Sequence, residues 1–279
     1  MFNMNEPVFR ALFSLTLFAA LAVAETVSPR RSLTVRKRRR WTMNLLLTGV
    51  NPLILRILFP LVPFSFAVIC SQKQWGLFNV ISIPVVSEVI ISVVILDLIL
   101  YLQHVAFHRF PLLWRFHLVH HADMDIDVTT GLRFHPIEAA LSMIIKLLAV
   151  AVIGPPALAV LIFEILLNGA SMFNHSNLNI PLWADRMLRL FIVTPDMHRV
   201  HHSVIIKEMD SNFGFNIPWW DRFFGTYKAQ PVRGHDGMKI GVGQFQDQAI
   251  ATIPWILKLP FTAHAGRNAA ILDRQRKGT

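Results

Sequence analysis

The sequence predicts an all-α integral membrane protein with about four to five transmembrane helices, including a hairpin over residues 137–173, and a helical cap. Three observations lead to this prediction. First, 53% of the 279 residues are hydrophobic and only 16% are charged, with a mean hydropathy of +0.46. Second, the apolar residues form blocks near the roughly 20 residues that a helix needs to cross a bilayer. Third, ten of the twelve histidines lie between residues 104 and 202, around the last of these blocks.

The first three apolar blocks span residues 8–24, 43–70 and 77–103, and three prolines interrupt the second. The first block is either a retained helix or a cleaved signal sequence, because Ala22-Val23-Ala24 resembles a cleavage site. No cation precedes the block within residues 1–7, whereas a secretory signal begins with positive charge. This absence favours a retained helix.

The last apolar stretch, residues 137–173, is divided by Gly154-Pro155-Pro156 into two arms of about 17 residues, the short end of a spanning helix. We therefore expect a membrane hairpin. Lys146 and Glu164 stand nine residues before and after Pro155, and so lie at similar depth in such a hairpin. Because charges inside a membrane usually pair, this placement predicts an ion pair between Lys146 and Glu164.

Basic residues predict the orientation in the membrane. Residues 29–41 contain seven Lys and Arg, whereas the loop at residues 71–76 contains one. The positive-inside rule then places residues 29–41 in the cytoplasm. Following the helices in order places residues 104–136 and 174–279 on the same side, and the second segment carries 13 further Lys and Arg. The net charge of +10 therefore reflects topology, and we expect no nucleic-acid partner.

The spacing of the histidines predicts a metal site. Residues three and four apart share one face of a helix. Three groups have this spacing: His104 and His108; His117, His120 and His121; and His198, His201 and His202. These eight imidazoles exceed the needs of one zinc ion and suit two metal ions, each with about four or five nitrogens. Imidazole is a ligand for zinc, copper, iron and nickel.

The surroundings of the third group predict how it is presented. Thr194-Pro195-Asp196 is typical of a helix start, with Thr194 as the N-cap and an acid in the first turn. We therefore expect His198, His201 and His202 on a helix that begins at the membrane surface.

Other chemistries are excluded by what the sequence lacks. A single cysteine, Cys70, excludes an internal disulfide framework, a cysteine-based zinc site and an iron–sulfur cluster. The sequence has no HExxH, no di-iron ExxH pair, no GxSxG and no P-loop. Asp123, Asp125 and Asp127 alternate as in a calcium loop, but the glycine and glutamate that complete one are missing. Any metal must therefore be held mainly by imidazole or oxygen.

The histidines stand within longer motifs. These are Asp97…Tyr101-Leu-Gln-His104-Val-Ala-Phe-His108, Trp114-Arg-Phe-His117-Leu-Val-His120-His121, Leu132-Arg-Phe-His135-Pro136, Asn174-His175-Ser176-Asn177, Thr194-Pro-Asp-Met-His198-Arg-Val-His201-His202 and Trp220-Asp221-Arg222-Phe-Phe-Gly225-Thr226-Tyr227. Together they resemble the histidine boxes and closing motif of the fatty acid hydroxylase/sterol desaturase superfamily, in its bacterial-type form. The resemblance spans residues 87–227, about half of the chain.

The resemblance implies a membrane di-iron enzyme that uses O2 as cosubstrate to hydroxylate or desaturate a fatty acyl, sterol-like or other isoprenoid lipid. The cofactor it implies is two iron ions, which zinc readily replaces in histidine sites. The metal ligands expected are His104, His108, His117, His120, His121, His135, His175, His198, His201 and His202. No fused cytochrome b5 domain is recognised, so we expect a separate electron donor, ferredoxin-like or cytochrome b5-like, with its reductase.

Two residues in these motifs have open roles. Asp97 shares a helix face with His104 and His108 but lies about 10 Å deeper, from a rise of about 1.5 Å per residue. It either supports a ligand or lines the substrate path, or its role is structural. His135 is either a ligand or the hydrogen-bond partner of one, because Pro136 favours an extended backbone before it.

The implied organisation has three parts. Residues 1–86 form N-terminal membrane helices with a basic cytoplasmic loop, residues 87–230 form the catalytic domain, and residues 231–279 form a cytoplasmic tail. The expected location is the bacterial inner membrane, with the metal site facing the cytoplasm.

Two alternative functions use the same histidines. A membrane zinc hydrolase needs only three or four protein ligands, which leaves most of these histidines unexplained. A metal transport or metal-binding protein is a non-enzymatic alternative. A transporter holds its ligands near the membrane midplane, whereas these histidines are expected at helix ends.

Overall fold

The computed structural model describes residues 6–246 and 252–265. Within these residues the fold is all-α without a β-sheet, and five segments are long and apolar enough to cross a membrane. The predicted fold class is confirmed, and the protein is a multi-pass membrane protein. The helices are α1 Glu6–Val27, α2 Lys37–Leu58, α3 Pro63–Lys73, α4 Val85–Arg109, α5 Pro111–His121, α6 Pro136–Ile153, α7 Ala157–His175, α8 Leu182–Leu188, α9 Pro195–His201, α10 Ile206–Met209, α11 Trp219–Phe223, α12 Gly234–Gly237 and α13 Ile253–Lys258.

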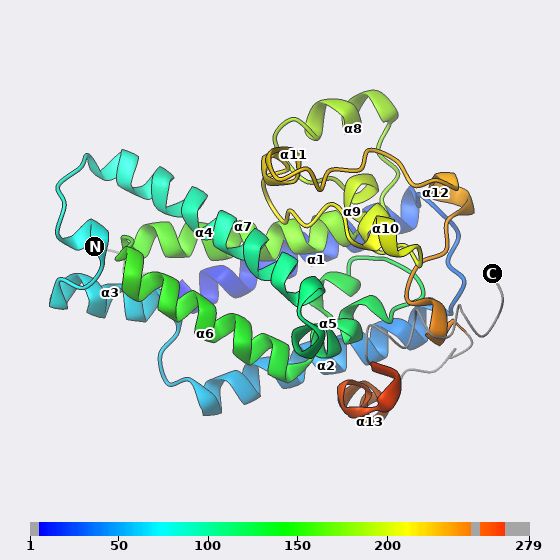
Figure 1. Cartoon of the computed structure of the whole chain (residues 1–279), viewed down its shortest axis with the longest axis horizontal. Helices are drawn as coiled ribbons and strands as arrows, with labels where there is room; N and C mark the ends of the chain where they lie inside the picture. Colours follow the sequence, from blue (N-terminus) through cyan, green and yellow to red (C-terminus); the bar gives the residue numbers. More distant parts are fainter. Residues whose placement is uncertain (1–5, 247–251, 266–279) are drawn as a thin grey trace.

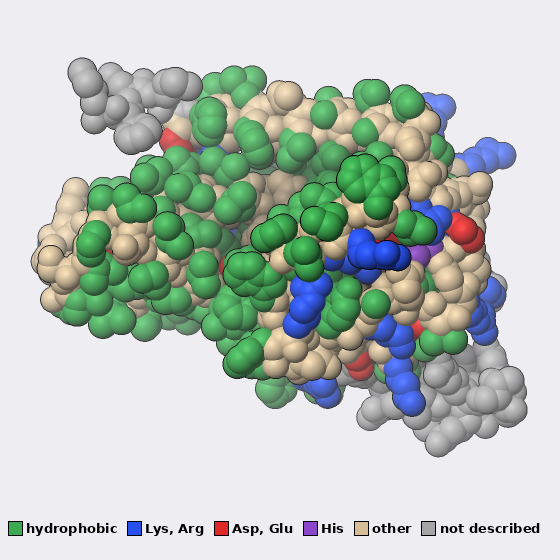
Figure 2. Space-filling view, turned by 90° about the horizontal axis from the view of Figure 1, so that it is seen from above, with side chains coloured by type: hydrophobic (Ala, Val, Ile, Leu, Met, Phe, Trp, Pro, Cys, Tyr) green, Lys and Arg blue, Asp and Glu red, His purple; other side chains and the backbone are tan. Residues whose placement is uncertain are grey.

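The long helices run along the longest axis of the molecule, and the short ones gather at one end (Figure 1). We call α5 and α8–α12, with their connecting loops, the cap. Helices α1, α4 and α7 end at the cap, whereas α2 and α6 begin there. Apolar side chains cover the surface away from the cap, whereas Lys and Arg side chains gather at the cap end, among further apolar side chains (Figure 2). This division is the one expected when the long helices lie in lipid and the cap lies in water.

Prolines decide where the predicted apolar blocks break. The second block is two helices, because the chain is extended at Phe59 and Val62 around Pro60 and resumes a helix with Pro63 at its first turn. The third block starts later than predicted, after Pro84, and continues to Arg109. Helix α2 begins at Lys37, so four of the seven cations of the basic segment lie in its first turn instead of in a loop.

The predicted hairpin is present as α6 and α7, and glycine shapes its tip. Gly154 ends α6 in the left-handed region, with a φ of 64°. Gly76, whose φ is 93°, packs so closely that a Cβ atom on it would lie 2.3 Å from the Gly154 nitrogen. Asn79 also donates a hydrogen bond to the Gly154 carbonyl at 3.2 Å. The loop between α3 and α4 is thereby fixed against the far end of the hairpin.

The predicted ion pair between Lys146 and Glu164 is wrong. Glu164 pairs instead with Arg10 of α1, whose Nη1 lies 2.8 Å from its Oε2. Lys146 lines a cavity between the helices. The hairpin places the two residues at similar depth, but depth does not decide which face of each helix carries the side chain. The α7 face that carries Glu164 meets α1.

Helix α1 is joined to the cap as well as to the membrane helices. Leu21 packs in one apolar cluster with Val128 of the cap and Met172 of α7. The buried carboxylate of Glu25 accepts hydrogen bonds from the backbone N–H groups of Val128 and Asn177, both at 3.0 Å. These contacts hold the end of α1 against two loops that follow histidine-bearing helices.

Candidate metal centre

Four helix ends meet beneath the cap and bring the histidines together. His104 and His108 lie in the last two turns of α4, and Pro111 starts α5 directly after an extended residue, Phe110, so that the chain reverses. His175 is the last residue of α7. Helix α9 begins as predicted, because the Thr194 side chain accepts the Met197 N–H and Pro195 occupies the first turn.

Nine of the ten predicted ligands form two adjoining clusters. In each cluster, one side-chain nitrogen per residue lies within 4.8 Å of all the others. Cluster A contains His104, His108, His117, His121 and His201, and cluster B contains His120, His175, His198 and His202. The two clusters offer five and four nitrogens, and two metal ions held by them stay a prediction. All nine rings are buried, with at most 2% of each residue exposed.

Hydrogen bonds orient the rings. Five of them donate the Nδ1–H to an acceptor outside the clusters: His104 to Phe213 O (2.7 Å), His117 to Glu138 Oε1 (2.6 Å), His120 to Arg133 O (3.2 Å), His175 to Ser171 O (2.7 Å) and His201 to Ser211 O (2.8 Å). A neutral imidazole that donates through Nδ1 carries a lone pair on Nε2. These rings therefore turn their ligating nitrogens inward.

The inward-facing Nε2 atoms lie closer together than two unshared lone pairs allow. The Nε2 atoms of His104 and His117 are 3.1 Å apart in cluster A, and those of His120 and His175 are 3.0 Å apart in cluster B. Each of these four rings already uses its proton at Nδ1, so neither member of a pair has an N–H to offer the other. Two facing lone pairs repel unless a cation lies between them. This donor set fits a metal ion in each cluster.

Burial keeps the cap histidines neutral. Loss of hydration lowers the pKa of His117 to about 3 and lowers the pKa of His121 and His201 well below the usual range. The same cause, with neighbouring histidines adding to it, lowers the pKa of His198 and His202. Because only the neutral imidazole binds a metal, these rings are ready to act as ligands at neutral pH.

Comparison with known proteins bears directly on this site. Residues 89–226, which include every histidine of both clusters, match the family model described as fatty acid hydroxylase.

This chain belongs to the fatty acid hydroxylase family.

Its relatives within and around this family segment have named lipid activities. The chain is 29% identical over 148 residues to an ornithine lipid hydroxylase of Rhizobium tropici, 31% over 145 residues to an alkylglycerol monooxygenase of Danio rerio, and 27% over 149 residues to a cholesterol 25-hydroxylase of Rattus norvegicus. These matches cover 53%, 50% and 52% of this chain but only 44%, 31% and 48% of the relatives. The chain thus spans less than half the length of each of them. No solved structure gives a significant match.

His135 lies apart from both clusters of the family segment. It stands at the start of α6, where its Nδ1 accepts the Ile137 N–H at 3.1 Å. Its Nε2 lies 3.3 Å from the Leu257 carbonyl and donates to it. Both ring nitrogens are therefore used, and the structure does not bring this predicted ligand to the others. The extended backbone that Pro136 favours turns the ring away.

Asp97 connects two parts of the family segment. Its carboxylate accepts hydrogen bonds from Asn216 Nδ2 at 2.7 Å and from Trp220 Nε1 at 2.8 Å. The residue is buried and is not among those that line the cavity next to the histidines. These contacts attach the closing motif to α4, so the geometry supports the structural role among those predicted.

Glu138 is a part of the site that the sequence motifs do not predict. Glu138 lies in the first turn of α6 and is buried, with 4% of the residue exposed. It accepts the proton of His117 Nδ1, which is the carboxylate–histidine arrangement that commonly orients metal ligands. One signal was available in the sequence: Glu138 is the single acid of α6.

A buried ion-pair network holds the loop after α5, and the sequence did not predict this network either. Arg40 of α2 pairs with Asp123 through Nε at 2.6 Å and with Asp127 through Nη1 at 2.5 Å. Burial alone disfavours a charged carboxylate, but Arg40 outweighs it and lowers the pKa of Asp123 to about 2. Asp123 and Asp127 thus hold an arginine, and they support the helix end that carries His120 and His121.

A cavity of about 280 Å³ lies between α2, α4, α6 and α7 and reaches His104 and His117 of cluster A. We call it the membrane cavity. Leu55, Leu100, Phe107, Leu132, Phe134, Leu167 and Phe215 give it an apolar lining. Lys146 contributes a single ammonium group two turns of α6 beyond Glu138. The cavity thus offers a largely apolar space between the membrane helices that ends at cluster A.

Proposed function

We propose that this protein is an O2-dependent di-iron hydroxylase of membrane lipids. The proposal rests on one observation. Two buried imidazole clusters with inward-facing nitrogens lie at one end of an apolar cavity between membrane helices. Membership of the fatty acid hydroxylase family supports iron as the metal, and the relatives' printed activities on lipids support a lipid substrate. All three of those activities are oxygenations, which favours hydroxylation over desaturation.

The protein's own residues would prepare the reaction. The nine clustered histidines would hold two iron ions, which would supply the O2-dependent oxidation of a C–H bond. Glu138 orients His117, and the backbone carbonyls of Phe213 and Ser211 orient His104 and His201. The apolar walls of the membrane cavity would align the lipid and exclude water from cluster A.

The reaction also requires two electrons from outside this chain, because hydroxylation by O2 reduces the second oxygen atom to water. We propose a separate electron-carrier protein with its own reductase. The basic loop between α1 and α2 lies at the cap end, and the positive-inside rule then puts the cap and the carrier in the cytoplasm, at the inner membrane of a bacterial cell.

The test is metal content together with oxygen incorporation. The purified protein is expected to hold two irons per chain, one for each imidazole cluster, and to incorporate labelled oxygen from O2 into a lipid of a membrane extract. Substitutions His120→Ala and His201→Ala should lower both the iron content and the turnover. Substitution His135→Ala is the matched control, because that ring lies outside both clusters and should leave two irons bound.

Several results would contradict this function. Zinc-loaded protein that hydrolyses a lipid without O2 would favour the membrane hydrolase. Metal-dependent transport into vesicles, with no turnover of lipid, would favour the transporter. Full activity in the His120→Ala or His201→Ala variants would refute the assignment of the site.

A further inference from the structure

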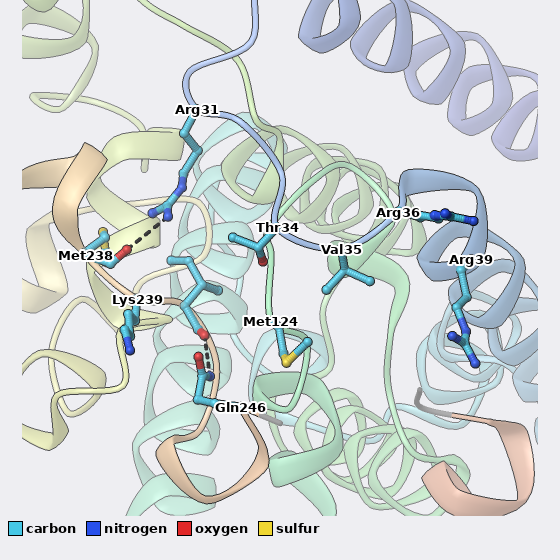
Figure 3. Close-up of a pocket in the computed structure, with 10 residues that line it drawn as sticks. Arg31, Thr34, Val35, Arg36, Arg39, Met124, Met238, Lys239 and Gln246 are labelled. Carbon is cyan, nitrogen blue, oxygen red and sulfur yellow. Dashed lines mark hydrogen bonds between the residues drawn. The ribbon is translucent and has the colours of Figure 1, made fainter. Parts of the chain in front are cut away.

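A second concave site lies at the cap end of the molecule, outside the membrane cavity. Its volume is about 470 Å³, and it lies between the loop that joins α1 to α2 and the segment 238–246 (Figure 3). We call it the basic pocket. Its lining residues are Arg31, Thr34, Val35, Arg36, Arg39, Met124, Met238, Lys239, Ile240 and Gln246.

The charge of the basic pocket has one sign. Four of its lining residues are Lys or Arg and none is Asp or Glu. Arg36 and Arg39 flank one side, and Arg31 and Lys239 flank the other (Figure 3). Arg31 donates hydrogen bonds to the carbonyls of His235 and Met238. Arg36, Arg39 and Lys239 are exposed, and none of these three forms an ion pair with a described residue.

Two carboxylates act on Arg31, but Asp236 pairs with Arg30 and Asp125 does not neutralise the charge at the surface. Asp125 is 1% exposed and is turned beneath the loop. It accepts the backbone N–H groups of Thr34 and Val35, at 2.8 Å and 2.7 Å from its Oδ2. Asp125 thus fixes the shape of the pocket wall, and the outward cations are left for a partner.

The walls of the basic pocket are continuous with the metal centre. The Gly241 N–H donates to the His202 carbonyl at 2.9 Å, and the Val204 N–H donates to the Lys239 carbonyl at 3.0 Å. Met124, on the opposite wall, lies three residues after His121. Two walls of the pocket therefore contact backbone next to residues of both clusters. A molecule seated here lies against segments that are one hydrogen bond or a few residues away from cluster histidines.

We propose that the basic pocket is the docking site for an acidic one-electron carrier protein. This inference rests on the proposed function, which needs two electrons for each oxygenation. Two reduced carriers would dock in succession, each would be oxidised by one electron, and the protons would come from solvent. Complementary charge steers such short-lived encounters and makes them fast. The methionines Met124 and Met238 offer an adaptable apolar contact at the centre.

The position of the pocket favours a protein over a lipid headgroup. Basic segments beside membrane helices also bind anionic lipids. However, Lys239 comes from a segment that is hydrogen-bonded to the backbone at His202 and Val204, so this wall of the pocket adjoins the chain that bears cluster histidines. Electron transfer requires close approach of the two redox centres, which this place provides.

The experiment measures carrier binding separately from turnover. The probes are a plant-type [2Fe–2S] ferredoxin and the soluble domain of cytochrome b5, and the protein is held in nanodiscs of neutral phosphatidylcholine. The test variant is Arg36→Glu/Arg39→Glu/Lys239→Glu. The control variant, Arg186→Glu/Lys207→Glu/Arg233→Glu, makes the same change in net charge on other exposed parts of the cap. Iron content verifies that both variants retain the metal centre.

At least one carrier is expected to bind the wild-type protein in a salt-sensitive manner, and the test variant should bind it roughly tenfold more weakly. The KM for the carrier should rise by a similar factor, whereas turnover driven by dithionite should stay unchanged. The control variant should behave like the wild type.

Three outcomes would overturn the inference. The first is that neither carrier binds the wild-type protein. The second is equal binding by the test and control variants. The third is dithionite-driven turnover that needs phosphatidylglycerol and is lost in the test variant, which would assign the pocket to a lipid headgroup. Salt-sensitive binding that the test variant loses, with no oxygenation under any reductant, would leave the docking site standing and refute the proposed function.

Discussion

Five of the clustered histidine rings use Nδ1 for orientation and direct Nε2 to a shared centre. In His104, His175 and His201 the orienting acceptor is a backbone carbonyl, and in His117 it is the Glu138 carboxylate. A backbone acceptor cannot be predicted from a sequence, because every residue supplies a carbonyl group. The spacing of the histidines predicted which residues share a face, but it did not indicate the partners that select the tautomer.

Glu138 is the residue whose side chain most directly controls a cluster histidine. We predict that Glu138→Gln lowers iron affinity and turnover by about 10–100-fold, because loss of the carboxyl acceptor loosens His117 and reduces the basicity of its Nε2. Iron content during dialysis against a chelator, and initial rates with saturating iron, would measure the two effects. Glu88→Gln, on the exposed part of α4 away from the cap, is the control. Unchanged iron retention in Glu138→Gln would contradict the prediction.

Lys146 is expected to select the substrate. Its ammonium is the only Lys or Arg group that lines the membrane cavity, about 12 Å along α6 from Glu138 at about 1.5 Å per residue. A lipid with an acceptor oxygen at that separation from the oxidised carbon would gain a charge-assisted hydrogen bond. We predict that Lys146→Met raises KM by about 10–100-fold and changes kcat less, measured on the lipid identified by profiling. An unchanged KM, matching a Lys73→Met control, would remove Lys146 from substrate binding.

At the scale of the elements, prolines and glycines determined the breaks, and their positions were readable. Pro63 and Pro111 begin helices, and Gly154 ends one. The sequence pattern did not predict how each helix is rotated about its own axis. Lys146 and Glu164 have equal depth, yet the face of α7 that carries Glu164 meets Arg10 of α1. Neighbouring helices set this rotation, and they come from distant parts of the chain.

The contact between two loops at the far end of the bundle is expected to limit stability. A Cβ on Gly76 would lie 2.3 Å from the Gly154 nitrogen and 2.9 Å from the Ala151 carbonyl oxygen, and the φ of Gly76 is positive. We predict that Gly76→Ala destabilises the protein by about 1–3 kcal/mol, seen as a lower Tm in detergent. Gly49→Ala is the matched control. A Cβ there meets no atom within 4 Å, and the helical position should gain about 0.5–1 kcal/mol. Equal Tm values for both variants would contradict this account.

At the scale of the whole molecule, charge asymmetry and helix order predict one orientation. Figure 2 shows Lys and Arg side chains gathered at the cap end, among further apolar side chains, and apolar side chains over the long helices. In a Cys70→Ala background, we predict that Lys73→Cys reacts with an impermeant maleimide on intact spheroplasts. Lys207→Cys, on the cap, should react only after permeabilisation, since both positions are exposed in the structure. Labelling of Lys207→Cys from outside would reverse the topology.

The sequence by itself determined the class of the protein. Apolar blocks predicted the membrane helices, basic residues predicted a common side for the histidines, and three- and four-residue spacings predicted rings directed to common points. These properties are local, because they depend on residues within one helix or on the composition of one loop. The family resemblance added the expected chemistry, and the comparison with the family model confirmed the membership.

Only the tertiary structure decided how the histidines divide. The helix ends, brought together by packing, join His201 to the rings of α4 and α5 in cluster A, and His120 to His175 in cluster B. Adjacent residues such as His120 and His121 point into different clusters because neighbours on a helix face about 100° apart. The same packing left His135 outside, placed Glu138 behind His117, and joined Arg40 to Asp123 across 83 residues. Contacts between distant segments depend on the relative positions of whole helices, and no local pattern in the sequence encodes those positions.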